Sequence, residues 1–120
     1  MNRRQRRKQV LVVEPDAGAL TRLRGMVDGL GYRGLGGRSV AEAGAIARGA
    51  KLSMALVASA AGPELEGLVD LLRKAAVPVV VLYPGEETRP TLPGAAGYLP
   101  TPVRTSDLVS TLYRYAGAPQ

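Results

Sequence analysis

Polar side chains that could do chemistry follow four apolar runs of the sequence. They lie in the segments Glu14–Asp16, Ser59–Pro63, Tyr83–Gly85 and Leu99–Pro102. Glu14 and Asp16 carry carboxylates that could gather a cation, while the Ser59 hydroxyl is a weak nucleophile without a neighbouring base. Histidine and cysteine are absent, which excludes Ser-His and Cys-His catalysis, disulfides, and metal sites built from thiolates or imidazoles. We expect no enzyme, no metal site and no cofactor, with Asp16 acting as a helix cap rather than as a metal ligand.

The chain between these positions alternates between strand and helix patterns. Apolar runs predict strands at residues 9–14, 32–36, 54–58, 77–83 and 97–99. Apolar residues at helical spacing predict helices at 17–31, 39–49 and 64–76, and a last one opened by Thr105 or Ser106. This alternation favours an α/β fold, a flavodoxin-like doubly wound five-stranded parallel sheet covered on both faces. The functional edge of such a sheet lies beyond the carboxyl ends of its strands, where the polar segments would meet.

Local signals mark where several helices begin and end. Asp16 is predicted to cap the first helix, because short carboxylates accept hydrogen bonds from free N–H groups at a helix start. Ser39 and Glu42 have the spacing of a capping box for the second helix. Gly31 is typical of a helix end. These signals support the boundaries that the hydrophobic periodicity indicates.

Length and composition indicate one domain with its own core. The chain has 120 residues and is 46% hydrophobic, which is enough for one packed domain and too short for two. It has five Tyr but neither Phe nor Trp, so Val, Leu and Ala must fill the core. No apolar run approaches the roughly 20 residues of a membrane helix, and no signal-peptide pattern follows the basic start. We expect a soluble, cytoplasmic protein.

The basic charge is concentrated at the start of the chain. The formal net charge is +6, and five positive charges come from Arg3, Arg4, Arg6, Arg7 and Lys8. The rest of the chain is therefore close to neutral. One interpretation is a solvated, disordered tail; the other is an arm for nucleic acid, anionic lipid or an acidic partner, without aromatic residues for base stacking. We expect a tail at 1–8, a domain at 9–116, and a linker or frayed end at 117–120.

The motifs resemble the response-regulator receiver (CheY-like) family from about Val10 to Ala116. VLVVEPD resembles the first strand and acidic cluster of that family, and GPELEGLVDLL resembles the loop and third helix after the phosphoacceptor, with Pro63 and Gly67 in place. VPVVVLYP is similar to the fourth strand, and GYLPTPV to the fifth strand with its Lys-Pro turn. The resemblance implies the receiver fold and a role in two-component signal transduction.

The same resemblance places other residues where a receiver has its chemistry. The phosphoacceptor aspartate falls on Ser59, and of the paired acids after the first strand Glu14 remains while the second falls on Pro15. The hydroxyl residue of the fourth strand falls on Tyr83, and the lysine falls on Thr101, with Pro102 retained. Phosphoryl transfer needs a carboxylate nucleophile, a magnesium site and a cation. The resemblance therefore implies a degenerate pseudo-receiver that does not accept phosphate on aspartate.

Residues 59–61 have several interpretations at this point. Ser59 and the two alanines after it could simply pack the loop. Alternatively, Ser59 contacts a ligand or is the target of a separate kinase. The sequence leaves these alternatives open.

The segment before the last predicted strand indicates an altered switching surface. PGEETRPTLPGAAG is short for the receiver family and contains three prolines, which disrupt a helix interior. We therefore expect the fourth helix of a receiver to be missing or reduced to one turn. The alternatives are a deletion without consequence and a rebuilt partner-binding surface. The candidate residues for that surface are Glu86, Glu87, Arg89, Tyr98 (which matches the family's switch aromatic), Tyr113 and Arg114.

Two classes of function follow from these observations. The leading hypothesis is a phosphorylation-independent module for protein–protein interaction or dimerisation in signalling. The alternative is a nucleic-acid-associated adaptor that uses the Arg-rich arm, with strong salt dependence. An enzyme or small-molecule site has little support, because VEPDAGAL does not match the glycine-rich dinucleotide fingerprint.

Overall fold

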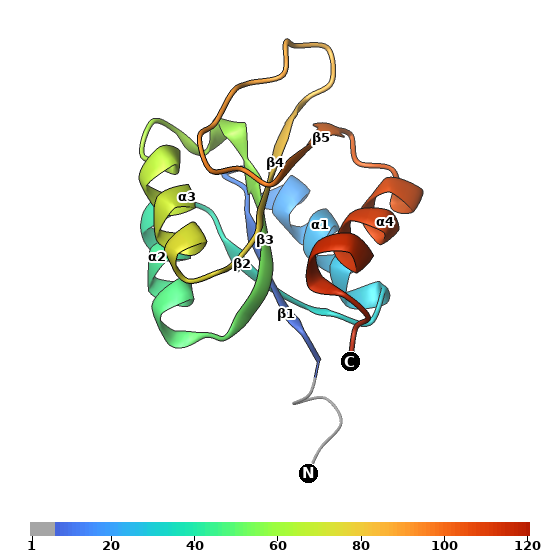
Figure 1. The fold of residues 1–120 in the computed structure, drawn as a ribbon. Helices are drawn as coiled ribbons and strands as arrows, with labels where there is room; N and C mark the ends of the chain where they lie inside the picture. Colours follow the sequence, from blue (N-terminus) through green and yellow to red (C-terminus); the bar gives the residue numbers. More distant parts are fainter. Residues whose placement is uncertain (1–6) are drawn as a thin grey trace.

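Residues 7–120, the part of the chain that the computed structural model describes, form five strands and four α-helices (Figure 1). The elements in chain order are β1 (Gln9–Val13), α1 (Ala17–Gly29), β2 (Arg33–Gly37), α2 (Val40–Gly49), β3 (Leu52–Ala58), the 3-10 turn η2 (Ser59–Ala61), α3 (Leu65–Lys74), β4 (Val79–Pro84), β5 (Gly97–Thr101) and α4 (Thr105–Ala116). The strands are parallel in the order β2-β1-β3-β4-β5. This is the doubly wound α/β fold that the sequence predicts.

Helices cover both faces of the sheet (Figure 1). Successive strand residues point to opposite faces, so Val10 and Val12 of β1 pack in one cluster and Leu11 and Val13 in the other. The first cluster takes its helical side chains from α1 and α4, and the second from α3 and α2. Because both faces are covered, the central strands are continuous apolar runs rather than alternating ones.

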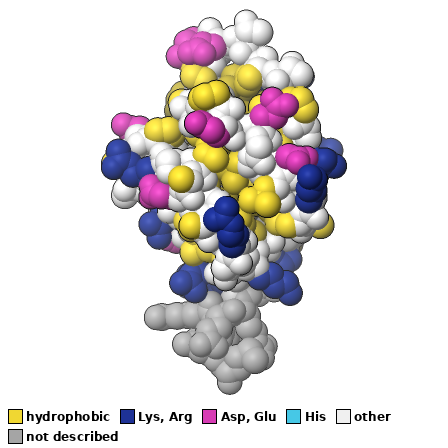
Figure 2. Space-filling view, turned by 90° about the vertical axis from the view of Figure 1, so that its left-hand side faces the viewer, with side chains coloured by type: hydrophobic (Ala, Val, Ile, Leu, Met, Phe, Trp, Pro, Cys, Tyr) yellow, Lys and Arg dark blue, Asp and Glu magenta, His cyan; other side chains and the backbone are white. Residues whose placement is uncertain are grey.

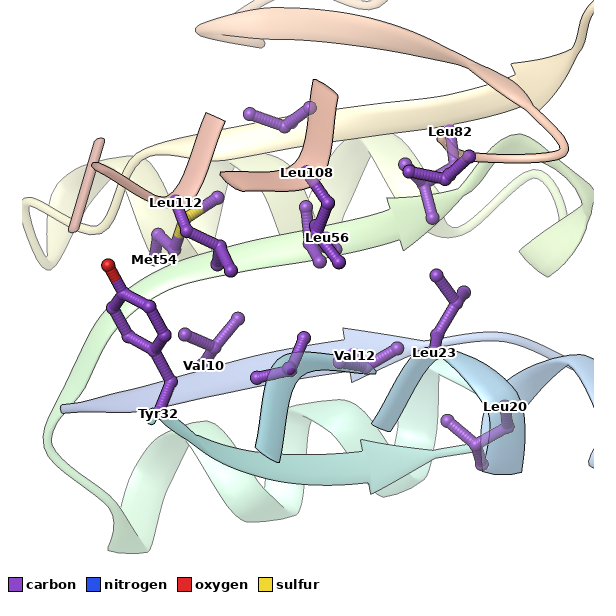
Figure 3. Close-up of a cluster of buried hydrophobic side chains, with 13 residues drawn as sticks. Val10, Val12, Leu20, Leu23, Tyr32, Met54, Leu56, Leu82, Leu108 and Leu112 are labelled. Carbon is purple, nitrogen blue, oxygen red and sulfur yellow. The ribbon is translucent and has the colours of Figure 1, made fainter. Parts of the chain in front are cut away.

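The cluster under α1 and α4 shows how Leu, Val and Met fill the core without Phe or Trp (Figure 3). Met54 and Leu56 project from β3 between Val10 of β1 and Leu112 of α4. These side chains are at most 1% exposed. Full burial of one such side chain stabilises the fold by roughly 1.5–3 kcal/mol. The apolar strand pattern thus accounts for most of the core.

Two of the predicted helix caps form at the residues where the sequence predicts them. The Asp16 carboxylate accepts a hydrogen bond from the Ala19 N–H at 2.8 Å, and Ser39 Oγ accepts one from the Glu42 N–H at 3.1 Å. Helix α1 ends two residues before Gly31, which has a φ of +96° that favours glycine. The last helix begins at Thr105, after Arg104 as N-cap residue without a side-chain cap. The fold therefore confirms the caps at Asp16 and Ser39.

No helix lies between β4 and β5 in the part of the chain that the structure describes. Residues 85–96 form instead an irregular loop above the sheet, which we name the β4–β5 loop (Figure 1). Its prolines account for the loss of regular structure, because each lacks an N–H donor and clashes with the preceding helical turn. This confirms that the fourth helix of a receiver is missing.

The segment after α4 contacts the start of the sheet. The Lys8 N–H donates to the Pro119 carbonyl at 3.0 Å, and Lys8 Nζ donates to the Ala116 carbonyl at 2.7 Å. The Tyr32 hydroxyl donates to the Gly117 carbonyl. The domain boundaries at residues 9 and 116 stay predictions, and Arg3, Arg4 and Arg6 of the arm lie outside the described residues. Within residues 7–120, no helix is long and apolar enough to span a membrane.

Candidate functional site

The carboxylates after β1 are held by backbone hydrogen bonds. Glu14 Oε2 accepts the Asp16 N–H at 2.7 Å, and the Asp16 carboxylate is the cap of α1. The Arg38 guanidinium donates from Nε to the Pro15 carbonyl at 3.1 Å, which ties the end of β2 to this turn. Both carboxylates thus have a local structural role.

Ser59 begins the 3-10 turn at the end of β3. Its side chain is partly buried and lines a hollow of about 260 Å³ with Val81, Pro90 and Leu92, and Glu66 is the acidic residue of this hollow. The hollow therefore combines one hydroxyl with mostly apolar walls. The β4–β5 loop supplies one of those walls.

A second hollow lies at the ends of β1 and β5. Its volume is about 310 Å³, and its polar lining comes from Glu14, Arg22, Glu86 and Thr101. Thr101 Oγ1 donates to the Tyr83 carbonyl at 3.3 Å, so this hydroxyl joins the ends of β4 and β5. Ser59 lines the first hollow and Glu14 the second, although the ends of β3 and β1 are neighbours in the sheet, with Val57 paired in register with Val13.

Comparison with known proteins gives matches among solved structures. No family model and no curated protein matches the sequence. A CheY-like response regulator receiver domain protein from Methanospirillum hungatei JF-1 is 19% identical, with a TM-score of 0.77 over 89% of this chain and 91% of that chain. The chemotaxis protein CheY4 of Vibrio cholerae is 21% identical, with a TM-score of 0.76 over 91% of this chain and 98% of that chain. The chain has the CheY-like receiver fold.

The residues at this edge do not fit the magnesium ion that a receiver site implies. Magnesium prefers carboxylate, phosphate and water oxygens in octahedral geometry. Glu14 is followed by Pro15, which has neither a carboxylate nor an N–H, and Ser59 after β3 offers a hydroxyl instead of a carboxylate. Among residues 7–120, no group of three or more acidic side chains is close enough together to hold a metal ion.

Tyr98, which the sequence analysis predicts to match the switch aromatic of a receiver, holds the β4–β5 loop. Its hydroxyl accepts the Leu92 N–H at 2.9 Å and lies 3.3 Å from the Leu92 carbonyl, to which it donates. The Arg89 guanidinium stacks 4.7 Å from the centre of the Tyr98 ring. One side chain therefore binds the loop by two hydrogen bonds and a cation–π contact.

The candidate partner-binding residues do not form one continuous surface. Tyr98 and Arg114 line a shallow hollow of about 190 Å³ between β5 and α4, and Arg89 reaches the same ring. Glu86 lies in the hollow that contains Glu14. The Tyr113 side chain is 61% exposed and lies near Tyr32, whose pKa is raised by burial and, to a lesser extent, by the Tyr113 phenol. The structure thus groups Arg89, Tyr98 and Arg114 and separates the others.

Acidic residues gather at this edge of the sheet, which the sequence analysis missed. Helix first turns and strand ends account for eight of the ten acidic residues: Glu14, Asp16, Glu42, Glu64, Glu66, Glu86, Glu87 and Asp107. Most acidic side chains in Figure 2 likewise lie in its upper half. The sequence could have predicted this cluster. Acidic residues at helix N-termini complement the helix dipole, and all these N-termini meet at one edge of the sheet.

Proposed function

We propose that this chain is a pseudo-receiver, an atypical receiver domain of two-component-type signal transduction that is not phosphorylated on aspartate. It acts in the cytoplasm as a phosphorylation-independent module for protein–protein contact or self-association. The receiver fold supports the signalling class. The chemistry at the strand ends supports the loss of phosphate transfer.

The observation that carries this proposal is that the strand ends lack the groups that phosphotransfer needs. A phosphoacceptor needs a carboxylate, acidic metal ligands and a cation around one cavity. Ser59 follows β3 with a hydroxyl instead of a carboxylate, and Pro15 follows Glu14. Among residues 7–120, no group of three or more acidic side chains is close enough together to hold a metal ion. Thr101 is neutral and too short to replace the lysine that a receiver has at this position.

The fixed β4–β5 loop supports a partner surface that does not depend on phosphate. Glu86, Glu87 and Arg89 are exposed on this loop, and Tyr98 holds its far half through Leu92. A surface held in one arrangement binds with a smaller ordering cost than a flexible one. Partner concentration would then set the activity of the module.

Phosphotransfer is tested by intact-mass measurement after incubation with a small acyl phosphate and Mg²⁺. We expect the mass of the full chain to stay unchanged. As a positive control, the variant Pro15→Asp/Ser59→Asp/Thr101→Lys restores the missing groups on the same backbone, and we expect it to gain one phosphoryl group. A phosphoryl group on a carboxylate of the unaltered chain would overturn the proposal.

The interaction role is tested with the full chain as bait in nuclease-treated lysate of the source cell. We expect the same protein, or a second copy of the chain, to be captured with and without acyl phosphate. Glu86→Lys/Glu87→Lys should abolish capture, while Glu64→Lys/Glu66→Lys makes the same charge change at the N-terminus of α3 and should preserve it. Capture that requires acyl phosphate, or that both variants weaken equally, would contradict this role.

A further inference from the structure

An open hollow lies between the C-terminal halves of α2 and α3, next to the start of β3. It is at the edge of the sheet where the strands begin, opposite the candidate site. Its volume is about 320 Å³, and its apolar wall includes Ala47, Leu52, Leu71, Leu72 and Val77. Figure 2, which views the molecule from the side of α2 and α3, shows hydrophobic side chains among Lys and Arg side chains on this face. We name this feature the α2–α3 hollow.

The apolar wall of the hollow continues onto the surface through Leu71. Leu68 and Leu72 in the same helix are at most 3% exposed, whereas Leu71 is 42% exposed. A single exposed leucine is ordinary on a protein surface. Leu71 differs because it borders a hollow whose wall also contains the buried side chains of Leu72 and Val77. An apolar ligand in the hollow would therefore contact exposed and buried aliphatic groups together.

Two cations, Arg48 and Lys51, border the α2–α3 hollow. Arg48 is in the last turn of α2, where the helix dipole favours a cation, but Lys51 lies between α2 and β3, outside any helix. Among residues 7–120, neither side chain forms an ion pair. Asp70 precedes Leu71 but pairs with Arg73 and Lys74, whose hydrogen bonds hold the pKa of Asp70 below its usual value. The mouth of the hollow therefore favours an anion.

The extent of this surface favours a small ligand over a protein partner. A standard protein interface covers roughly 800 Å² on each partner and has an apolar centre. Of the exposed large hydrophobic residues within residues 7–120, Val109 and Tyr113 lie on α4, which covers the other face of the sheet, so this face has Leu71. The volume of the hollow lies instead at the lower end of the range for small-molecule sites, which is about 300–1,000 Å³.

We propose that the α2–α3 hollow binds a small aliphatic carboxylate, with its chain on the apolar wall and its head at Arg48 and Lys51. The described residues that line the hollow are all aliphatic or basic, so they suit a saturated chain and offer no ring for stacking a base. A guanidinium binds a carboxylate through two parallel hydrogen bonds. Phosphate groups are favoured at helix N-termini, whereas α2 and α3 present their C-terminal ends here, which suits a singly charged head better. This inference goes beyond the proposed signalling function and does not depend on it.

The test follows the amide signals of the full chain by nuclear magnetic resonance during titration with octanoate. We expect saturable binding with a dissociation constant of about 1 mM, the strength typical of a ligand of this size. The signals that shift should be those of residues 47–52 and 71–77. Octanol has the same chain without the charge and should bind about tenfold more weakly, because it cannot pair with the two cations. Octylammonium, which carries the opposite charge, should not bind.

Three variants separate the head contact from the chain contact. Arg48→Gln/Lys51→Gln should weaken octanoate binding about tenfold and leave octanol binding unchanged. Leu71→Ser changes an exposed position of the wall and should weaken both probes about threefold. The matched control is Arg22→Gln/Arg104→Gln, which removes the same charge from two exposed positions away from the hollow and should bind octanoate like the unaltered chain.

Three results would overturn the proposal. Equal weakening of octanoate binding by both double variants would show a general charge effect. Equal binding of octanoate and octylammonium would show adsorption to apolar surface without recognition of the head. Tighter binding at the hollow by a helical peptide of Leu and Glu than by octanoate would assign the hollow to a protein partner.

Discussion

At the residue scale, Tyr98 holds the β4–β5 loop in place, although the sequence analysis predicts that it matches the movable switch aromatic of a receiver. Its hydroxyl satisfies both backbone polar groups of Leu92, and its ring carries the Arg89 guanidinium. Moving this side chain outward would break two hydrogen bonds and one cation–π contact at once. The residue type that suggests a receiver switch therefore acts here as an anchor for the β4–β5 loop.

Tyr98→Phe tests this anchor. The change leaves the partly buried Leu92 N–H without a partner, so we expect the free energy of unfolding to fall by about 1–2 kcal/mol. Amide exchange at residues 85–96 should also accelerate. Tyr113→Phe removes a hydroxyl from a side chain that is 61% exposed and should change neither quantity. Equal effects of the two variants would refute the anchor.

The β4–β5 loop acts at the element scale as a substitute for the missing helix. The Ala96 N–H donates to the Val79 carbonyl at 2.8 Å, and the Tyr115 hydroxyl donates to the Ala96 carbonyl at 3.0 Å. Gly94 has a φ of +88° and lies against the side chains of Val69 and Arg73 on α3. The loop is thus connected to the sheet, to α4 and to α3.

Two glycine-to-alanine substitutions test whether the β4–β5 loop packs on α3: one at the contact and one, as a control, at an open position inside a helix. Gly94→Ala introduces a Cβ 3.3 Å from Val69 and Arg73 at a positive φ, so we expect a loss of about 1–2 kcal/mol in the free energy of unfolding. Gly25→Ala lies in the interior of α1 with nothing within 4 Å of the new Cβ, and should gain about 0.5–1 kcal/mol. Chemical denaturation measures both. A neutral Gly94→Ala would show that the loop does not rest on α3.

Charge separates along the whole molecule because helices and strands run in opposite directions. Helix N-termini and their acidic residues meet at the strand ends. Lys8, Arg33 and Lys51 lie at the strand starts, together with the segment after α4. The same arrangement brings Tyr32, before β2, to the Gly117 carbonyl. The end of the molecule where the strands finish is therefore acidic. The end where they begin is basic and carries the contacts of the segment after α4.

Tyr32→Phe tests the contact between the two ends of the domain. The neutral phenol donates to Gly117, so we expect a loss of about 1 kcal/mol in the free energy of unfolding at neutral pH. Burial raises the pKa of the phenol above its usual 10.0, so this contribution is complete below pH 10 and is lost as the pH rises through the folded pKa. Stability measured from pH 7 upward should show the difference shrinking. Tyr83→Phe is the control, since its hydroxyl forms no hydrogen bond among the described residues.

The sequence by itself determined the fold, the caps and the missing helix. Apolar runs report burial directly, Asp16 and Ser39 act within three residues of themselves, and the prolines exclude a helix whatever surrounds them. That Ser59 offers a hydroxyl and no carboxylate after β3 is likewise visible in the sequence. These signals are local or periodic. They depend on the covalent structure and hydrophobicity of nearby residues and not on contacts between distant ones.

Only the tertiary structure decided how distant residues combine. It tied Tyr98 to Leu92 and divided the candidate partner residues. The sequence analysis predicted a basic arm and a nearly neutral domain. In the folded chain, acidic residues gather at the strand ends and basic residues at the strand starts. Net charge is a sum and carries no position, so only the packing of helices and strands against one another reveals this polarity.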